Sequence, residues 1–137
     1  MIVTLMLSAI LVTIFFVFLL APVFVGYVFG REIEGCRVIE HSRLMRMLGL
    51  KGLAIYPVVF VEGAALTAKQ NRTVLLNHEK IHLAQQAELF VLPFYLLYLV
   101  EAKQKEYVDI SFEREAFENE RRSSYLKTRQ RFAWRKY

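Results

Sequence analysis

The sequence is poor in cysteine, proline and glycine, and it carries no charged side chain before residue 31. Its 137 residues include one cysteine, three prolines and six glycines. A single cysteine cannot form an intrachain disulfide, so a disulfide-stapled fold is excluded. The apolar content of 55% provides ample surface to bury, which excludes a largely disordered chain. The length suits about one domain.

The uncharged segment at the N-terminus, residues 1–30, is the most apolar part of the chain. Its only small polar side chains are Thr4, Ser8 and Thr13. A bilayer core needs about 20 apolar residues in a helix, and this run is longer. A cleaved signal peptide would need a charged start and a shorter apolar run. We therefore predict a retained transmembrane helix that anchors the protein in a lipid bilayer.

Basic residues follow this segment closely. They are Arg31, Arg37, Arg43, Arg46 and Lys51. Because loops rich in lysine and arginine stay on the cytoplasmic side of a membrane, residues 31–137 are expected in the cytoplasm.

Residues 31–137 are expected to form one compact, mainly α-helical domain with a single short strand. The aliphatic run 54–61 is typical of a strand, and Pro57 makes it an edge strand or one that starts late. Helical patterns cover residues 42–48, 73–105 and 110–137.

Two histidines four residues apart carry the clearest chemical signal. His78 and His82 frame the pattern H-E-x-x-H. On a helix these positions share one face, about 5–6 Å apart, so both imidazoles can bind one Zn²⁺. Glu79 lies about 100° around the helix, where it can act as the general base of a metallopeptidase. The alternative is a helix with two solvent-facing histidines. We favour the metal site, because a strand-like segment precedes the helix, as the edge strand of an active site would.

A catalytic zinc site usually has a third protein ligand. Cys36 and His41 lie upstream, and Glu101, Glu113 and Glu115 lie downstream. The two last carboxylates follow His82 by about 30 residues, which leaves room for a second helix to return past the first.

Glu113 and Glu115 would point about 200° apart on a helix, so only one can face the histidines. We favour Glu115 as the ligand and keep Glu113 as the alternative. Asn119 lies one turn beyond Glu115, where its amide oxygen could accept the free N–H of a zinc-bound imidazole.

The pattern His78-Glu79-x-x-His82 with a later helical glutamate resembles the gluzincin group of zinc metallopeptidases. With its anchor, the chain is similar in organisation to the integral-membrane peptidases of that group, whose ligand glutamate is followed four residues later by Asp or Asn, as Glu115 is by Asn119. The stretch 77–119 also resembles small bacterial membrane proteins that pair an N-H-E-K-I-H helix with an F-E-R-E-A segment. The resemblance implies a minimal zincin-like core, a Zn²⁺ cofactor and a bacterial inner-membrane location.

Two further segments suggest contact with lipid. Residues 89–100 carry no charge and are short for a bilayer span. They form either a buried core helix or a segment at shallow membrane depth against the N-terminal helix, and we favour the second. Residues 121–137 hold seven basic side chains interleaved with aromatic ones and no acidic residue. Anionic headgroups are their expected partner, in preference to nucleic acid.

The predicted function is therefore hydrolysis of peptide bonds in a protein or peptide substrate by a membrane-anchored zinc enzyme. Two alternatives remain open: a membrane protein that keeps the metal for structure alone, and a membrane adaptor without a metal.

Overall fold

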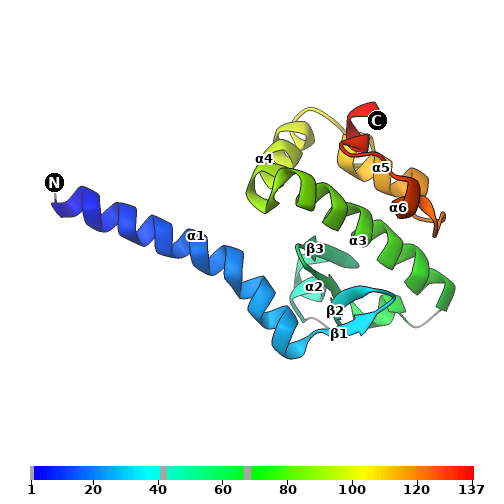
Figure 1. Cartoon of the computed structure of the whole chain (residues 1–137), viewed down its shortest axis with the longest axis horizontal. Helices are drawn as coiled ribbons and strands as arrows, with labels where there is room; N and C mark the ends of the chain where they lie inside the picture. The colour runs from blue at the N-terminus through cyan, green and yellow to red at the C-terminus, as the bar shows by residue number, and fades with distance from the viewer. Residues whose placement is uncertain (1, 41–42, 67–68) are drawn as a thin grey trace.

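The computed structural model describes residues 2–40, 43–66 and 69–137. A long N-terminal helix, α1 (Ile2–Phe29), projects from a body built around a second long helix, α3 (Lys69–Leu89). In the body, α3 lies between a small sheet and a group of shorter helices from the C-terminal part of the chain (Figure 1). Helix α3, which carries His78 and His82, thus forms the middle layer of the body.

The sheet has four short strands in the order β1-β2-β4-β3. Their bounds are β1 (Arg31–Ile33), β2 (Cys36–Ile39), β3 (Gly52–Ile55) and β4 (Val58–Val61). The inner pair, β2 and β4, is parallel, and both outer strands are antiparallel to their neighbours. The helix α2 (Arg43–Leu48) lies in the connection from β2 to β3. Because β3 stands last in the strand order, it is an edge strand of the sheet.

The prediction of a single strand over 54–61 is wrong, because the chain turns within that run. Tyr56 and Pro57, joined by a cis peptide bond, connect β3 to β4. Proline has no N–H to donate to a strand ladder, so the strand does not continue through it. The other hairpin turns at Glu34 and Gly35, whose φ angles of 49° and 79° fit a tight two-residue hairpin turn.

Strands β1 and β2 gave no recognisable sequence signal because they are three and four residues long and expose charged side chains on one face. Periodicity needs a longer segment to be recognised. The opposite face packs on α3 and forms a hydrophobic core. Its fully or largely buried members are Cys36, Val38, Val59, Val61 and Leu76.

The prediction of one helix over 73–105 is also wrong. The chain breaks at Phe90, whose φ is 64°, and a new helix, α4 (Val91–Ala102), leaves at an angle of 111°. Pro93 explains the break, because its ring would clash with the carbonyl of Leu89 in a continuous helix. In the first turn of α4 its missing N–H costs nothing.

The prediction of a transmembrane helix over residues 1–30 is corrected as well. Among the described residues no single helix is long and apolar enough to cross a membrane, and only the bent pair Asn71–Leu89 with Val91–Ala102 reaches that length and composition. An uncharged run meets the sequence requirement for a span, but core helices and signal sequences meet it too. At its C-terminal end, α1 is fastened to the sheet by Arg37 Nη1, which donates to the carbonyl oxygens of Gly26 and Tyr27.

The C-terminal part is not the single helix predicted from residue 110. It contains α5 (Ser111–Asn119), followed by residues 120–137, here called the C-terminal arm, which hold α6 (Tyr125–Thr128) and a final 3₁₀ turn (Ala133–Lys136). A second core lies between α4, α5 and the arm. It consists of Phe94, Ile110 and Phe112, with Leu89, Tyr95, Tyr98 and Trp134 around them. The arm turns at Phe132, whose φ is 56°, so it packs back on α5.

Candidate metal centre

His78 and His82 lie one turn apart on α3, and both are buried with 7% exposure. Their rings meet edge to face, and the two Nε2 atoms are 3.1 Å apart. The predicted i, i+4 placement is therefore realised with the same ring atom of each histidine aimed at one point.

Glu113 of α5 completes this cluster. Its Oε2 lies 3.2 Å from His78 Nε2, and its Oε1 lies 3.5 Å from His82 Nε2. Ligand atoms at about 2.0–2.1 Å from a tetrahedral Zn²⁺ lie roughly 3.3 Å from one another. The three side chains are buried and close enough to hold a metal ion.

Each imidazole has a partner on its other nitrogen. His78 Nδ1 lies 3.0 Å from Glu120 Oε2, and His82 Nδ1 lies 2.8 Å from Gln85 Oε1. An acceptor at Nδ1 places the ring hydrogen there and leaves the Nε2 lone pair for a metal. Tyr98 donates its hydroxyl hydrogen to Glu113 Oε1 at 2.9 Å, which fixes the carboxylate.

The electrostatics of the cluster favour a buried positive charge. Burial lowers the pKa of His82, but the hydrogen bond to Glu113 and the charges of Glu113 and Glu79 raise it to about 9. Burial raises the pKa of Glu113, yet the two imidazoles hold that pKa well below its usual range. Two carboxylates thus stabilise any cation bound at the histidines.

Glu79 lies between the histidines and the edge strand β3. It is 5% exposed, and burial above all raises its pKa although both imidazoles lower it. The backbone N–H of Ala54 donates to its carboxylate. At Gly52 the strand comes so close that a Cβ atom would overlap Glu79 Oε1. The absence of a side chain at Gly52 therefore makes room for the carboxylate.

Two adjoining cavities open onto these residues. One of about 940 Å³ is lined by the start of β3, by α3 and by the end of α5. The other, of about 240 Å³, is lined by His82 and Glu113, by Tyr95 and Tyr98 of α4, and by Tyr107 of the 3₁₀ turn that follows α4. His78 and Glu79 line both cavities, so the cluster stands at their junction.

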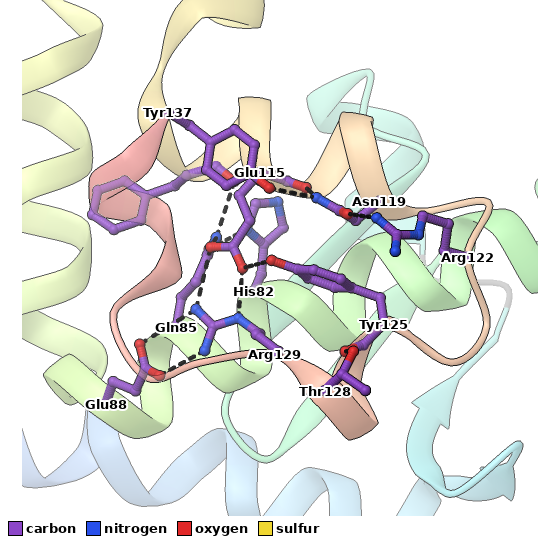
Figure 2. A network of polar contacts seen from close by, with 11 residues as sticks. His82, Gln85, Glu88, Glu115, Asn119, Arg122, Tyr125, Thr128, Arg129 and Tyr137 are labelled. Atoms are coloured by element: carbon purple, nitrogen blue, oxygen red, sulfur yellow. Dashed lines mark hydrogen bonds and ion pairs between the residues drawn. The ribbon is translucent and has the colours of Figure 1, made fainter.

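The structure does not place Glu115 next to the histidines. Its side chain is fully buried, but it accepts hydrogen bonds from Arg129, Tyr125 and Gln85 on another side of α5. Figure 2 shows this carboxylate pointing toward Arg129. The order of preference between Glu115 and Glu113 is therefore reversed.

Asn119 is equally remote from the imidazoles. Its Nδ2 donates to the carbonyl oxygen of Glu115 and to the Tyr137 hydroxyl, while its Oδ1 accepts from Arg122 (Figure 2). It therefore ties α5 to the C-terminal arm, and the acceptor that we expected there is supplied by Glu120.

The remaining candidates for the third ligand serve elsewhere. Cys36 is buried in the sheet core. Glu101 accepts a hydrogen bond from the backbone N–H of Ser111 at the start of α5. His41 lies outside the described residues.

Glu120, Gln85 and Tyr98 contact the cluster but are not among the residues predicted from the sequence. Two of them had a signal. Glu120 follows Glu113 by two helical turns and so shares its face of the helix, and Gln85 follows His82 by about one turn and so shares the face of the imidazole that it contacts. Tyr98 had none, since its contact depends on how α4 returns after the break at Phe90.

The basic residues of segment 121–137 differ in their surroundings. Arg129 is buried, with 5% of its side chain exposed, between Glu88 and Glu115. The other basic residues are exposed, so only they are free to contact a solvent-side partner.

Comparison with known proteins finds no relative of this chain. The chain matches no known protein family, and neither a curated protein nor a solved structure shows significant similarity to it. What the protein does must therefore be inferred from the cluster at His78, His82 and Glu113.

Proposed function

We propose that the protein is a zinc-dependent hydrolase of peptide bonds, with His78, His82 and Glu113 as metal ligands and Glu79 as general base. The convergence of two Nε2 atoms and one carboxylate carries this proposal. Two nitrogens and one oxygen form the ligand set common in catalytic zinc sites of peptidases. A zinc ion held there would polarise a substrate carbonyl and lower the pKa of water.

Glu79 is suited to move the proton of the attacking water. Its raised pKa favours acceptance of a proton by the carboxylate, because a base works best with a pKa near the working pH. The same carboxyl group can then return the proton to the leaving amine nitrogen. The N–H of Ala54 holds one end of the carboxylate in place during both transfers.

A catalytic role is favoured over a purely structural metal site. Structural zinc sites are closed by four protein ligands, whereas catalytic sites have three and an open position. Among the described residues only three side chains converge, and cavities adjoin the cluster on two sides. A site built only to stabilise the fold needs neither the open side nor a buried glutamate beside it.

The larger cavity suggests a polymeric substrate. Its volume of about 940 Å³ lies near the upper end for sites that hold small molecules. Its lining combines apolar side chains, such as Leu50 and Phe117, with charges of both signs from Lys51, Glu62 and Arg121. A stretch of polypeptide with mixed side chains fits this lining better than a uniformly charged ligand.

The test compares the wild type with Glu79→Gln. We expect the purified full chain to contain one equivalent of zinc and to hydrolyse an unfolded protein such as casein. Glu79→Gln should keep the zinc and lose about 10²–10⁴-fold in rate, since it removes the general base. Equal rates for both proteins would overturn the proposed mechanism. Zinc without hydrolysis of any peptide mixture would leave a structural metal site.

We also propose that α4 rests on a lipid surface. It exposes several large apolar side chains, whereas the surface of a typical soluble monomer scatters such side chains singly. They are Leu92, Leu96, Leu97, Leu99 and Val100, and Phe90 just before the helix is exposed as well. A short apolar helix suits the boundary between headgroups and acyl chains.

An environment-sensitive fluorophore on Leu96→Cys would test this contact. Its emission should shift to the blue when vesicles with anionic lipid are added, while the same label on Met47→Cys, an exposed position on α2, should not respond. Equal responses at both positions would refute the proposal. The sidedness of residues 31–137 stays a prediction.

A further inference from the structure

A chain of buried polar side chains leads from His82 to the C-terminal arm. Gln85 is fully buried, and its Oε1 lies 2.8 Å from His82 Nδ1. Its Nε2 donates to the Phe112 carbonyl oxygen and to Glu115 Oε2, both at 3.0 Å. Figure 2 shows the side chains of His82, Gln85 and Glu115 gathered close together.

The partners of Gln85 Nε2 decide which way its amide points. A carboxylate and a backbone carbonyl can only accept hydrogen bonds. The amide nitrogen must therefore face Glu115 and Phe112, and the amide oxygen must face His82. Because that oxygen is also only an acceptor, the imidazole has to donate from Nδ1. The lone pair of Nε2 is then left facing His78 and Glu113.

Glu115 is itself held by the arm. Arg129 donates to it from Nε and Nη2, and the Tyr125 hydroxyl donates to Oε1 at 2.8 Å. The same guanidinium donates to both carboxylate oxygens of Glu88 on α3. All three charged side chains are at most 8% exposed. Without Arg129, two buried carboxylates would lose their cation, which is strongly unfavourable.

We propose that Glu115 and Arg129 are positioning residues of the metal centre, which act through Gln85 to fix the tautomer of His82 that presents Nε2 to the metal. This inference rests on the proposed metal site. The C-terminal arm then contributes to the metal site, because it carries the Arg129 guanidinium that orients Glu115.

Glu115→Gln in the full chain tests the inference. A glutamine at 115 can donate as well as accept, so only the Phe112 carbonyl oxygen still holds the amide nitrogen of Gln85 on that side. Arg129 keeps Glu88 as its partner, so no buried charge is left alone. We expect the affinity for Zn²⁺, measured by competition with a chromogenic chelator, to fall about 10–100-fold, as for other residues that support a metal ligand.

Glu88→Gln is the matched control. Glu88 binds the same guanidinium and is similarly buried, but no contact to Gln85 is found for it among the described residues. Its substitution should leave zinc affinity unchanged. Nitrogen-15 spectra of the histidines in the zinc-free protein at alkaline pH, where the His82 imidazole is neutral, add a readout that simple destabilisation does not move. His82 Nδ1 should be protonated in the wild type and in Glu88→Gln, and only partly in Glu115→Gln.

A second pair of variants covers the case in which Glu115→Gln does not fold. Gln85→Met removes the acceptor for His82, and should weaken zinc binding to the same extent. Gln86→Met is its control, because Gln86 is equally buried but bonds to Tyr56 and Ala54 of the sheet edge.

The outcomes separate this inference from the proposed function. A wild-type chain that takes up no zinc overturns both. A wild type that binds zinc beside Glu115→Gln with equal affinity overturns the inference alone, and so do equal losses in Glu115→Gln and Glu88→Gln.

Discussion

Glu113 and Glu115 stand two residues apart on α5, and their carboxylates serve opposite sides of that helix. Glu113 Oε2 lies 3.2 Å from His78 Nε2, whereas Glu115 forms an ion pair with Arg129. One turn of helix thus supplies both the carboxylate that faces the metal position and the carboxylate that anchors the C-terminal arm.

Replacing Glu113 by glutamine should remove most of the metal affinity. The side chain keeps its shape but loses the charge that faces both Nε2 atoms. Partners behind a ligand are worth about 10–100-fold in affinity, so loss of a ligand should exceed that range in a chelator competition. Glu118→Gln on the exposed side of α5 is the control. Unchanged affinity in Glu113→Gln would remove Glu113 from the ligand set.

Glu120→Ala should weaken zinc binding about 10–100-fold, because His78 Nδ1 loses its acceptor. Glu120→Gln should restore much of the affinity, since an amide oxygen can also accept the ring hydrogen. The comparison is made by chelator competition on both variants. Equal affinities for Glu120→Ala and the wild type would show that the contact at 3.0 Å does not support the metal.

Gly52→Ala should impair hydrolysis while zinc stays bound. The new Cβ atom would overlap Glu79 Oε1, so the carboxylate must move, and a displacement of about 1 Å can cost 10²-fold in rate. Zinc content and casein hydrolysis are measured on the same sample. In a Glu79→Gln background the alanine should add little further loss, because the two changes act on the same group. Additive losses would contradict a shared cause.

Glu101→Gln should destabilise the fold by about 1 kcal/mol at pH 7, as for loss of a helix cap. Burial raises the pKa of Glu101, but bonds from Lys105 and Ser111 outweigh it and lower the pKa. The folded pKa therefore lies below the unfolded value of about 4.3. The stabilisation is present above that value and is lost as pH falls through the folded pKa.

Urea denaturation of the wild type and Glu101→Gln at pH 7 and pH 3 measures this contribution. The difference in unfolding free energy should be clear at pH 7 and smaller at pH 3. Glu118→Gln, which breaks only an exposed pair with Arg114, should differ little from the wild type at either pH. A difference that grows toward acid would contradict the role of the Glu101 carboxylate.

The parts of the site that depend on one helix were predictable. The placement of His78, Glu79 and His82 follows from 3.6 residues per turn, whatever the rest of the chain does. The short helix predicted over 42–48 is likewise confirmed over Arg43–Leu48, and Ser42 lies outside the described residues. Strands β1 and β2 could not be predicted, because pairing between segments far apart, such as Arg37 with Val58, leaves no local pattern in so few residues.

By itself the sequence determined the histidine pair and the glutamate beside it, because local helix geometry brings them to adjacent faces. Only the tertiary structure decided between Glu113 and Glu115, since that choice depends on how α5 is rotated against α3. The packing of Phe112 in the second core and of Phe117 on the His78 ring sets this rotation. It turns Glu113 and Glu120 toward His78 and leaves Glu115 to Arg129, a residue that lies on the C-terminal arm and shows no local sign of its buried role.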